Sequence, residues 1–452
     1  MVHKERRAII SLAIIMACRM LGLFMILPFF SVYATHLAYA TPTLIGIALG
    51  AYGLTQACLQ IPFGALSDRW GRKKVITIGL LIFAVGSMVA ALSHSIYGII
   101  LGRALQGAGA MGSTLLAMAA DLSRDENRSK AMAILGLTIG FSFFIAIIIG
   151  PVIHQWLHLS GIFWTIFALA LIALLVLHTV VPNPPPLFIN TTTEYQRHQL
   201  VDVLKNNALL RLNVGIFTLH AMLTATFLAV PVLLTQNLNL SQHHQIFLYL
   251  NVMLICFVLM FPLIIVAEKK RQLRRVFLAA ILTLILTELL LAHFQHSLIL
   301  IELSLLGFFT AFSILEACLP SIVSKIAPIK RKGTAMGIYS TFQFLGIFMG
   351  GTLGGVIFGH FHLVGLFLFC AILGTLWLWI ASTMSEPPYL STYIFQLKSH
   401  QLHQLHLHLT ELQGVSEVAV MPNENLIYVK ADNKIISKDQ LRKCIDESNL
   451  RQ

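Results

Sequence analysis

The chain has 452 residues, of which 57% are hydrophobic and only 11% are charged, with a mean hydropathy of +0.80. A soluble domain averages about 25% charged residues, so this composition excludes a fully soluble protein. The six cysteines contain no Cys-x-x-Cys pair, so neither a disulfide framework nor a metal site is indicated.

Apolar runs about 18–25 residues long recur along most of the chain, and this length crosses roughly 30 Å of hydrocarbon. The first run is too long for the apolar core of a cleavable signal peptide, so it predicts a retained helix. Twelve transmembrane helices are predicted, at residues 8–30, 42–66, 75–92, 97–120, 129–153, 160–181, 209–235, 245–267, 276–292, 297–324, 333–358 and 363–383.

The longest polar break between spans begins at Pro182 and divides the predicted helices six plus six. We therefore expect an N-terminal six-helix bundle at residues 1–182, a cytoplasmic linker at 183–208 and a C-terminal six-helix bundle at 209–385. From about residue 391 the composition becomes that of a soluble domain, and we place a cytoplasmic domain at 386–452.

The two predicted bundles share local sequence features. Asp68 ends the second span as Glu268 ends the eighth, 200 residues later. The dipeptide Ala-Met begins the fifth span at residues 131–132 and the eleventh at 335–336, a separation of 204 residues. Parallel repeats of this kind place a substrate site between the halves, near the membrane midplane.

The basic residues predict the orientation of the chain. Lysine and arginine total 31; twenty-two lie in the N-terminal segment or in the loops after every second span, and seven follow residue 390. The remaining two, Arg19 and Arg103, lie inside spans. Because basic loops stay in the cytoplasm, both termini are predicted to be cytoplasmic. The net charge of +12 then reflects membrane topology and requires no nucleic-acid partner.

The segment after residue 390 has an α+β pattern. Residues 393–397, 415–420 and 426–430 are predicted strands, and leucines at 402, 405, 409 and 412 form a helical stripe that ends at Gly414. Ser437 and Gln440 form a capping box at the start of a last helix. The order is that of a small ferredoxin-like domain whose final strand is missing or very short.

The loop after the second span, residues 64–74, places Asp68 at a helix C-terminus, where the helix dipole is already negative. Asp68 therefore needs a positive partner, either an arginine or a helix N-terminus such as the one near Gly333. Gly64 would allow close approach of another backbone and Gly71 a tight turn. Such a cluster can latch one conformation shut, and the alternative is positive-inside charge alone.

Residues 64–74 resemble motif A of the major facilitator superfamily, and residues 103–109 resemble its motif B. With the ending at 382–388 and the tail, the chain resembles bacterial inner-membrane transporters of that superfamily that carry a ferredoxin-like domain. The resemblance implies a charge relay of Asp68, Arg72 and Asp121 that holds the outward-open state. The implied latch residues are Gly64, Asp68, Arg69, Gly71, Arg72 and Asp121.

Motif C of the antiporter subgroups is only partly present. Gly140, Gly150 and Pro151 fit it, whereas His154 and Gln155, like Ala146, stand where glycines are usual. This departure weakens the inference of antiport by resemblance.

Charged residues inside a bilayer are costly and are functional candidates by default. The N-terminal half contains Arg19 and Arg103, and the C-terminal half contains glutamates at 288, 302 and 316. We predict that an acid titrates as the halves rock, with Glu316 the first candidate. His220 is the second candidate, and the predicted proton-coupling set is Arg19, Arg103, Gln106, His220 and Glu316. The alternatives are a static ion pair for Glu316, a hydrogen-bonded core histidine for His220, and a headgroup position for the glutamates at 288 and 302.

Tyr52, Gln56 and Gln60 share one face of the second span and are predicted to line the substrate cavity; hydrogen bonding between helices is the alternative.

Histidines dominate the predicted outer loops, where no Lys, Arg, Asp or Glu occurs. The ten are His36, His94, His154, His158, His243, His244, His293, His296, His360 and His362. Below about pH 6 this face would become positive, which suggests adaptation to an acidic exterior. The alternative is that histidine replaces other interfacial polar residues.

In the tail, His403 and His406 are three residues apart, but the cysteine pair of ferredoxin-like metal-binding modules is absent, so no metal is expected.

The chain is therefore predicted to be a proton-coupled secondary transporter of the bacterial inner membrane that exports small amphipathic compounds by alternating access. No nucleotide-binding loop or catalytic constellation occurs, so no enzyme activity and no cofactor are expected. The expected partners are the lipid bilayer, a small-molecule substrate, protons, and a ligand or protein partner of the C-terminal domain. The alternatives are a uniporter or importer of a small metabolite, and a membrane sensor that signals through the cytoplasmic domain.

Overall fold

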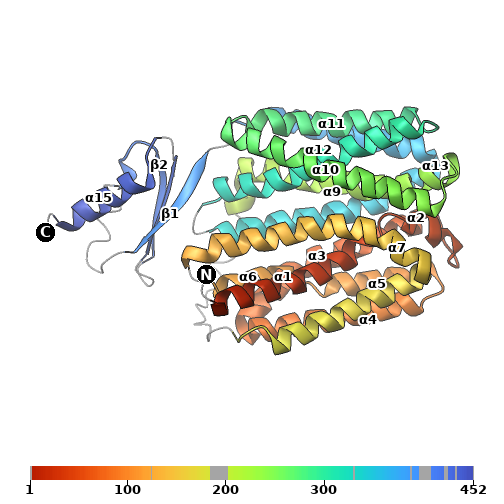
Figure 1. Cartoon of the computed structure of the whole chain (residues 1–452), viewed down its shortest axis with the longest axis horizontal. Coiled ribbons are helices and arrows are strands. Elements are labelled where there is room, and N and C mark those ends of the chain that lie inside the picture. The colour runs from red at the N-terminus through yellow and green to blue at the C-terminus, as the bar shows by residue number, and fades with distance from the viewer. Residues whose placement is uncertain are drawn as a thin grey trace.

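Long apolar helices form most of the structure (Figure 1). The computed structural model describes residues 3–123, 125–183, 202–328, 331–386, 389–396, 409–421, 426–432 and 435–450. The N-terminal half contains α1 (His3–Phe24), α2 (Phe30–Tyr33), the 3-10 turn η1 (Ala34–His36), α3 (Pro42–Trp70), α4 (Arg72–Leu92), α5 (Ile96–Ala108), α6 (Gly112–Asp121) and α7 (Asp125–Thr179). The C-terminal half contains α9 (Asn207–Val232), the π-helical turn η2 (Leu233–Asn237), α10 (Gln242–Lys269), α11 (Leu273–His293), α12 (Leu298–Ile326) and α13 (Lys332–Ser382).

Nine helices within the described residues are long and apolar enough to cross a membrane. Two of them, α7 and α13, contain two spans each, because the chain turns at His158 and at His362. The shorter α5 and α6 together occupy the predicted fourth span. The predicted twelve spans, six in each half, are thus accounted for.

The turns inside α7 and α13 follow the same internal repeat as the sequence. His158 and His362 both have a φ of 56°, and they are separated by the same 204 residues as the Ala-Met pairs. Three residues after each histidine stands a glycine, Gly161 or Gly365, where an added Cβ would overlap the side chain four residues earlier. The chain therefore reverses direction through the same local backbone conformation in both halves.

Two predicted spans are interrupted. The first was predicted as one helix over 8–30, but α1 ends at Phe24 and the chain turns through residues 25–29 before α2. Pro28 explains this end, because proline lacks an amide hydrogen and clashes with the preceding helical turn. The fourth span breaks between α5 and α6, where Gly107 and Gly109 lie directly against the carbonyl groups of Tyr52 and Gly79.

The C-terminal domain is a three-stranded antiparallel sheet, ordered β1-β3-β2, with one described long helix. Its elements are β1 (Leu390–Gln396), β2 (Val415–Met421), β3 (Leu426–Asp432) and α15 (Lys438–Leu450). Gly414 has the left-handed φ of 95° expected after a helix, and Ser437 and Gln440 exchange the hydrogen bonds of the predicted capping box. Most of the predicted 402–412 stripe lies outside the described residues.

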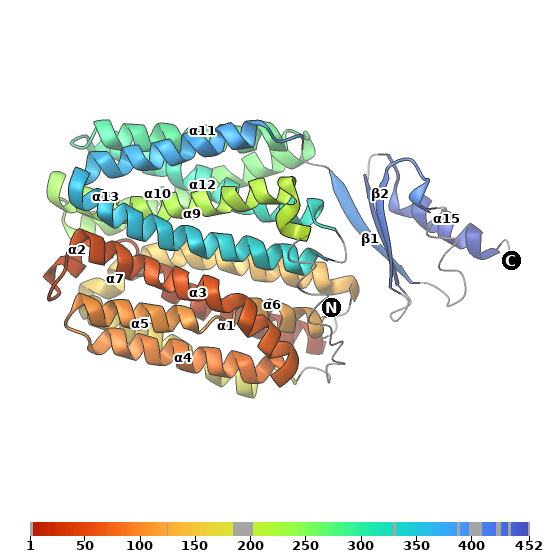
Figure 2. The ribbon, with the colours of Figure 1, turned by 180° about the vertical axis from the view of Figure 1, so that it is seen from behind.

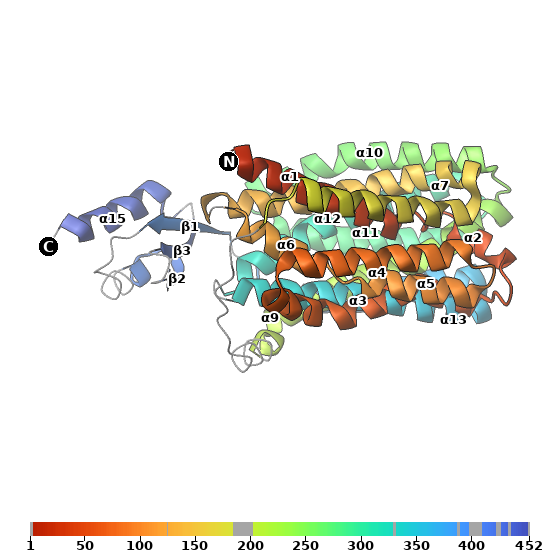
Figure 3. The same cartoon turned by 90° about the horizontal axis from the view of Figure 1, so that it is seen from below.

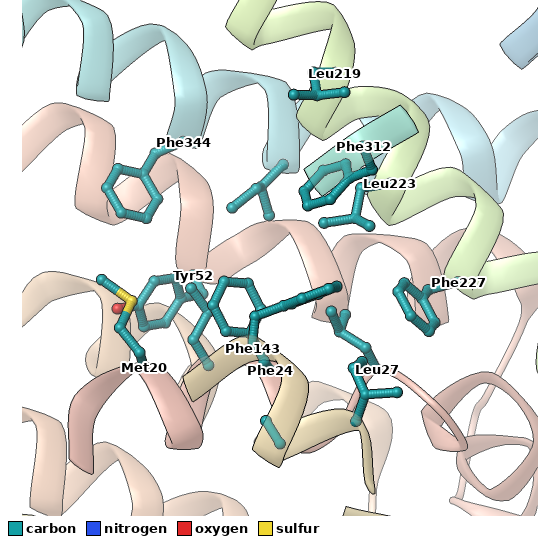
Figure 4. Packing of buried hydrophobic residues seen from close by; sticks show 14 of the residues in the cluster. Met20, Phe24, Leu27, Tyr52, Phe143, Leu219, Leu223, Phe227, Phe312 and Phe344 are labelled. Carbon is teal, nitrogen blue, oxygen red and sulfur yellow. The ribbon is translucent and has the colours of Figure 1, made fainter. Parts of the chain in front are cut away.

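The domain lies beyond one end of the helical bundle, beside the N-terminus (Figure 3). We call that end the domain end and the opposite one the far end. The first span of α13 runs between α9 and α3 and joins the two halves (Figure 2). Buried aromatic side chains from both halves, including Phe24, Phe143, Phe312 and Phe344, fill the centre (Figure 4).

Candidate functional site

Three polar side chains from three helices meet within the C-terminal half. The amide nitrogen of Gln343 on α13 lies 2.9 Å from Nε2 of His220 on α9, and it donates to Oε1 of Glu316 on α12 over 3.3 Å. His220 Nε2 and Glu316 Oε2 are 3.8 Å apart. The sequence predicted His220 and Glu316 as separate candidates, and the structure brings them together through Gln343, which the sequence reasoning missed.

We call Gln343, His220 and Glu316 the polar triad. Its hydrogen bonds fit the histidine tautomer that is protonated at Nδ1. His220 Nδ1 faces the carbonyl oxygen of Ile216 at 3.3 Å, so Nδ1 carries a hydrogen. Nε2 is then free to accept from Gln343, whose two amide hydrogens serve His220 and Glu316. The remaining oxygen of Glu316, Oε2, is buried and has no hydrogen-bond partner among the described residues. The triad can therefore take up a proton at either the carboxylate or the imidazole.

The N-terminal half contains two buried arginines that share one tyrosine. Arg19 on α1 donates to the hydroxyl of Tyr52 on α3 over 3.0 Å. The guanidinium carbon of Arg103 on α5 lies 5.0 Å from the centroid of the Tyr52 ring. Arg103 also donates to Gln106 over 2.9 Å, and Gln106 donates to Ser87 over 2.9 Å. Four of the predicted site residues thus form one cluster.

The predicted cavity-lining residues are enclosed. Tyr52 and Gln56 are fully buried and Gln60 is 4% exposed. The Gln56 amide donates to the Gln60 carbonyl oxygen one turn later, at 3.1 Å. In this structure none of the three faces an open cavity, so their contact with substrate stays a prediction.

The loop that resembles motif A contains a chain of charges. Arg72, at the start of α4, pairs with Asp68 and, over 2.9 Å, with Asp121 at the end of α6. Its guanidinium also donates to the Ser67 hydroxyl at 2.6 Å. The positive partner that Asp68 requires is therefore Arg72, four residues along the chain.

The glycines of this loop differ in what they do. Gly71 has a φ of 94° and forms the tight turn between α3 and α4, while Arg69 beside it is exposed. Gly64 is not a site of close backbone approach in this structure, because a Cβ there would meet only Ser113 Oγ at 3.5 Å. A Cβ on Gly333, at the start of α13, would meet no atom of the described residues within 4 Å outside its own helix.

The two halves instead make their closest backbone contacts toward the far end. A Cβ on Gly46 of α3 would lie 2.7 Å from Cα of Gly355 on α13, and a Cβ on Gly50 would lie 2.8 Å from the Phe348 carbonyl oxygen. Only glycine permits this proximity of α3 and α13.

A polar contact also joins the halves at the far end. The side-chain amide of Gln242, at the start of α10, lies 2.8 Å from Nδ1 of His154 on α7. His154 is only 3% exposed and packs against Tyr33, with the ring centroids 3.8 Å apart and the ring planes tilted by 40°. The other nine histidines predicted for this face are exposed. The environment of His154 is therefore an interface between the halves, which its loop-end position in the sequence did not reveal.

Glu288 on α11 does not occupy the headgroup position considered from sequence. It is fully buried and accepts a 2.6 Å hydrogen bond from Thr226 on α9. Glu302, by contrast, is partly exposed on α12.

The C-terminal domain is held against the C-terminal half by its third strand. Arg271, between α10 and α11, makes a two-pronged ion pair with Asp432 at the end of β3. The hydrogen bonds that Arg271 donates to the Asp432 carboxylate raise the pKa of the guanidinium. Lys430 on β3 is 4% exposed and donates to the carbonyl oxygen of Ala327, just after α12, over 2.9 Å. Burial lowers the pKa of Lys430.

No cluster of three or more metal-ligating side chains occurs among the described residues. The tail histidines at 400, 403, 406 and 408 lie outside the described residues.

Comparison with known proteins gives a consistent picture. A family model described as Major Facilitator Superfamily matches residues 12–271 and 212–393. The inner membrane transport protein YajR of Escherichia coli (strain K12) is 43% identical over 447 residues, covering 98% of this chain and 98% of that protein. An uncharacterised transporter of Buchnera aphidicola subsp. Acyrthosiphon pisum (strain APS) is 35% identical over 348 residues, covering 76% of this chain and 89% of that protein.

Solved structures are similar at lower sequence identity. The nucleoside transporter NupG gives a TM-score of 0.67 at 16% identity, covering 83% of this chain and 99% of that one. A D-xylose-proton symporter gives 0.66 at 17% identity, covering 84% and 98%. These two similarities concern the fold alone.

Proposed function

This chain belongs to the Major Facilitator Superfamily, as its motifs predicted, and from that premise we propose that it is a proton-coupled secondary transporter that exports small amphipathic compounds by alternating access. Transport across the inner membrane follows from the family and the relatives, which are transporters and not enzymes. Proton coupling, direction of transport and substrate are our proposals.

The observation that carries proton coupling is the polar triad of Gln343, His220 and Glu316. A carboxyl group and an imidazole lie 3.8 Å apart in an apolar bundle and share one bridging amide. A proton that binds to one of them changes the charge that the other experiences, because the surrounding dielectric is low. A movement of α12 relative to α13 would separate Glu316 from Gln343 and change its tendency to hold a proton.

We also propose that both termini are cytoplasmic and that the domain end is therefore the cytoplasmic end. The distribution of the basic residues supports this orientation. The N-terminus and the C-terminal domain lie at the same end of the bundle (Figure 1). The halves touch most closely toward the far end, at Gly46 and Gly50, so this conformation is closed to the outside.

The charge chain of Asp68, Arg72 and Asp121 is proposed as the conformational latch. It is assembled within the N-terminal half, while a Cβ on Gly333 at the start of α13 would meet no described atom of another segment within 4 Å. We propose that the latch engages α13 when the cytoplasmic side closes. Asp68, with 43% of its side chain exposed, is available for that contact.

The docked C-terminal domain favours a second role, regulation of the membrane domain. The contacts of Asp432 and Lys430 tie the domain to the ends of helices that must move during transport. Under this proposal, the domain biases the conformational equilibrium without contacting the substrate.

The experiment is proton movement in proteoliposomes that contain the purified protein and a pH-sensitive dye. A panel of amphipathic cations, acids and neutral compounds is added to wild type, to Glu316→Gln and to the matched control Glu302→Gln on the same helix. We expect substrate-dependent proton flux in wild type and in the Glu302 variant, and none in the Glu316 variant. Equal flux in all three proteins would remove Glu316 from the coupling site, and the absence of substrate-dependent proton flux in wild type would refute proton coupling for the compounds tested.

A further inference from the structure

The N-terminal half buries two positive charges next to each other. Arg19 is 2% exposed and Arg103 is 1% exposed, and they contact opposite parts of the same residue, Tyr52. We call them the arginine pair. They come from α1 and α5, so two helices are needed to build the pair around α3.

The arginine pair is poorly satisfied by the protein. A guanidinium has five N–H donors. Among the described residues, Arg19 donates to one neutral hydroxyl and Arg103 to one neutral amide oxygen. In the part of the chain that the structure describes, neither of the two buried Nε atoms has a hydrogen-bond partner. No carboxylate in the described parts of the chain lies within 4.0 Å of either guanidinium.

A buried charge without a counter-charge is strongly unfavourable, since removal from water is not offset by attraction to an opposite charge. A structural arginine would normally be paired or exposed. The unmet requirement of the pair is therefore a negative charge, and several free N–H donors are present to bind its oxygens. Guanidinium groups match carboxylates and phosphates through two parallel hydrogen bonds.

The surroundings leave room for the guanidinium and are apolar beyond it. A Cβ on Gly112, at the start of α6, would lie 2.7 Å from Nη1 of Arg19, so a larger residue would displace that group. Phe344, from α13 in the other half, has its ring centroid 6.0 Å from the Arg19 guanidinium carbon. Figure 4 shows Met20, Tyr52 and Phe344 gathered in this region.

The same segment of α13 connects the arginine pair to the polar triad. Phe344 contacts Arg19, and the adjacent Gln343 bridges His220 and Glu316. A ligand that displaced Phe344 would therefore disturb the amide that holds Glu316. This gives a physical route by which binding in one half alters proton binding in the other.

We propose that Arg19 and Arg103 bind the anionic group of the transported substrate, which is an amphipathic organic anion with a carboxylate on an apolar body. This inference rests on the proposed transport function and names its substrate class. Arg19 and Arg103 supply the charge, Tyr52 orients both, and the Phe-rich centre accommodates the apolar body.

The test is equilibrium binding to the full-length protein in detergent, measured as a shift in melting temperature. Benzoate and octanoate are the probes, and each is compared with its neutral amide. We expect both acids to raise the melting temperature of wild type in a saturable manner, with apparent affinities at least tenfold tighter than those of the amides. Arg19→Gln and Arg103→Gln should each weaken acid binding at least tenfold, while Arg6→Gln, which removes an exposed arginine, should bind as wild type does.

Two results would overturn the proposal. One is equal binding of each acid and its amide, or no binding of either acid, by wild type. The other is wild-type acid affinity in Arg19→Gln. The Arg19→Lys variant guards against misfolding, because it keeps the charge but loses the paired hydrogen bonds and should retain intermediate affinity. Proton coupling is not measured in this assay, so acid binding without proton flux in vesicles would refute the coupling proposal and leave the anion site standing.

Discussion

The close contact between α3 and α13 makes a sharp prediction about the conformational equilibrium. In Gly46→Ala, the new methyl group would start 2.7 Å from Cα of Gly355 and would also overlap the carbonyl oxygen of Gly351. Two non-bonded carbons prefer about 3.5–4.0 Å, so the helices must separate by roughly 1 Å where they touch. Overpacking of this kind costs about 1–3 kcal/mol. Only the state closed at the far end carries that cost.

The expected result is a shift toward the conformation that is open at the far end. A penalty of about 1–3 kcal/mol on one of two states changes their ratio about 5- to 150-fold. The reporter is Ser31→Cys, since Ser31 is 2% exposed in a cavity of about 210 Å³ between the halves. Labelling by a membrane-impermeant maleimide, in a background with the exposed Cys58 replaced by serine, should accelerate by that factor.

Gly337→Ala is the matched control on α13, because a Cβ there would meet nothing within 4 Å. Alanine also favours a helix over glycine by about 1 kcal/mol, so this control should keep or raise the melting temperature. An unchanged labelling rate at Ser31→Cys in the Gly46→Ala protein would show that the α3–α13 contact does not keep the far end closed. Equal acceleration by Gly337→Ala would show that the effect does not come from steric overlap.

Three further predictions follow from charges. Arg19→Met removes a buried charge that has no ion-pair partner among the described residues, together with one hydrogen bond to a neutral hydroxyl. The substrate-free protein should therefore gain about 1–2 kcal/mol in its free energy of unfolding, seen as a higher melting temperature in detergent. A lower melting temperature would mean that Arg19 is structural. Asp432→Asn removes the ion-pair partner of Arg271, so spin labels on α11 and α15 should report a broader distance distribution. Salt at 0.5 M, where the Debye length is about 4 Å, should broaden the distance distribution of wild type but hardly change that of the variant. Asp121→Asn removes one of the two carboxylates that Arg72 pairs with among the described residues and leaves Asp68. Transport should slow about tenfold with little change in melting temperature. An unchanged transport rate would show that Asp121 is not part of the latch.

Much of the fold was predictable because the bilayer imposes a simple length and polarity rule on each span. The predicted spans differ from the helices mainly at their ends, and the capping box at Ser437 and Gln440 was correct to the residue. The break after Ala108 was not predicted. It depends on how closely Gly107 approaches Tyr52 of another helix, and a single sequence does not contain that distance.

The candidate site was predictable residue by residue but not as a set of contacts. His220 and Glu316 stood out because polar groups are rare in apolar spans. They meet through Gln343 because of how three helices are rotated about their own axes. The hydropathy pattern of an almost wholly apolar helix does not determine that rotation. The available signal for Gln343 was that it is a polar side chain in the middle of the eleventh span. The sequence reasoning considered charged residues there and overlooked an uncharged amide.

The two halves are alike in backbone and unlike in chemistry, and this difference bears on coupling. Both halves turn at a histidine with the same φ, His158 or His362. The spans of one half nevertheless bury Arg19 and Arg103, whereas those of the other half contain the fully buried Glu288 and the partly exposed Glu316. If an anion neutralises the arginine pair while a proton neutralises Glu316, each half becomes less polar only when its own ligand is bound. Because Gln343 contacts Glu316 and the adjacent Phe344 contacts Arg19, ligand binding at either site would alter the surroundings of the other. Coupling in such a scheme needs no direct contact between substrate and proton, because α13 touches both sites and moves as one helix.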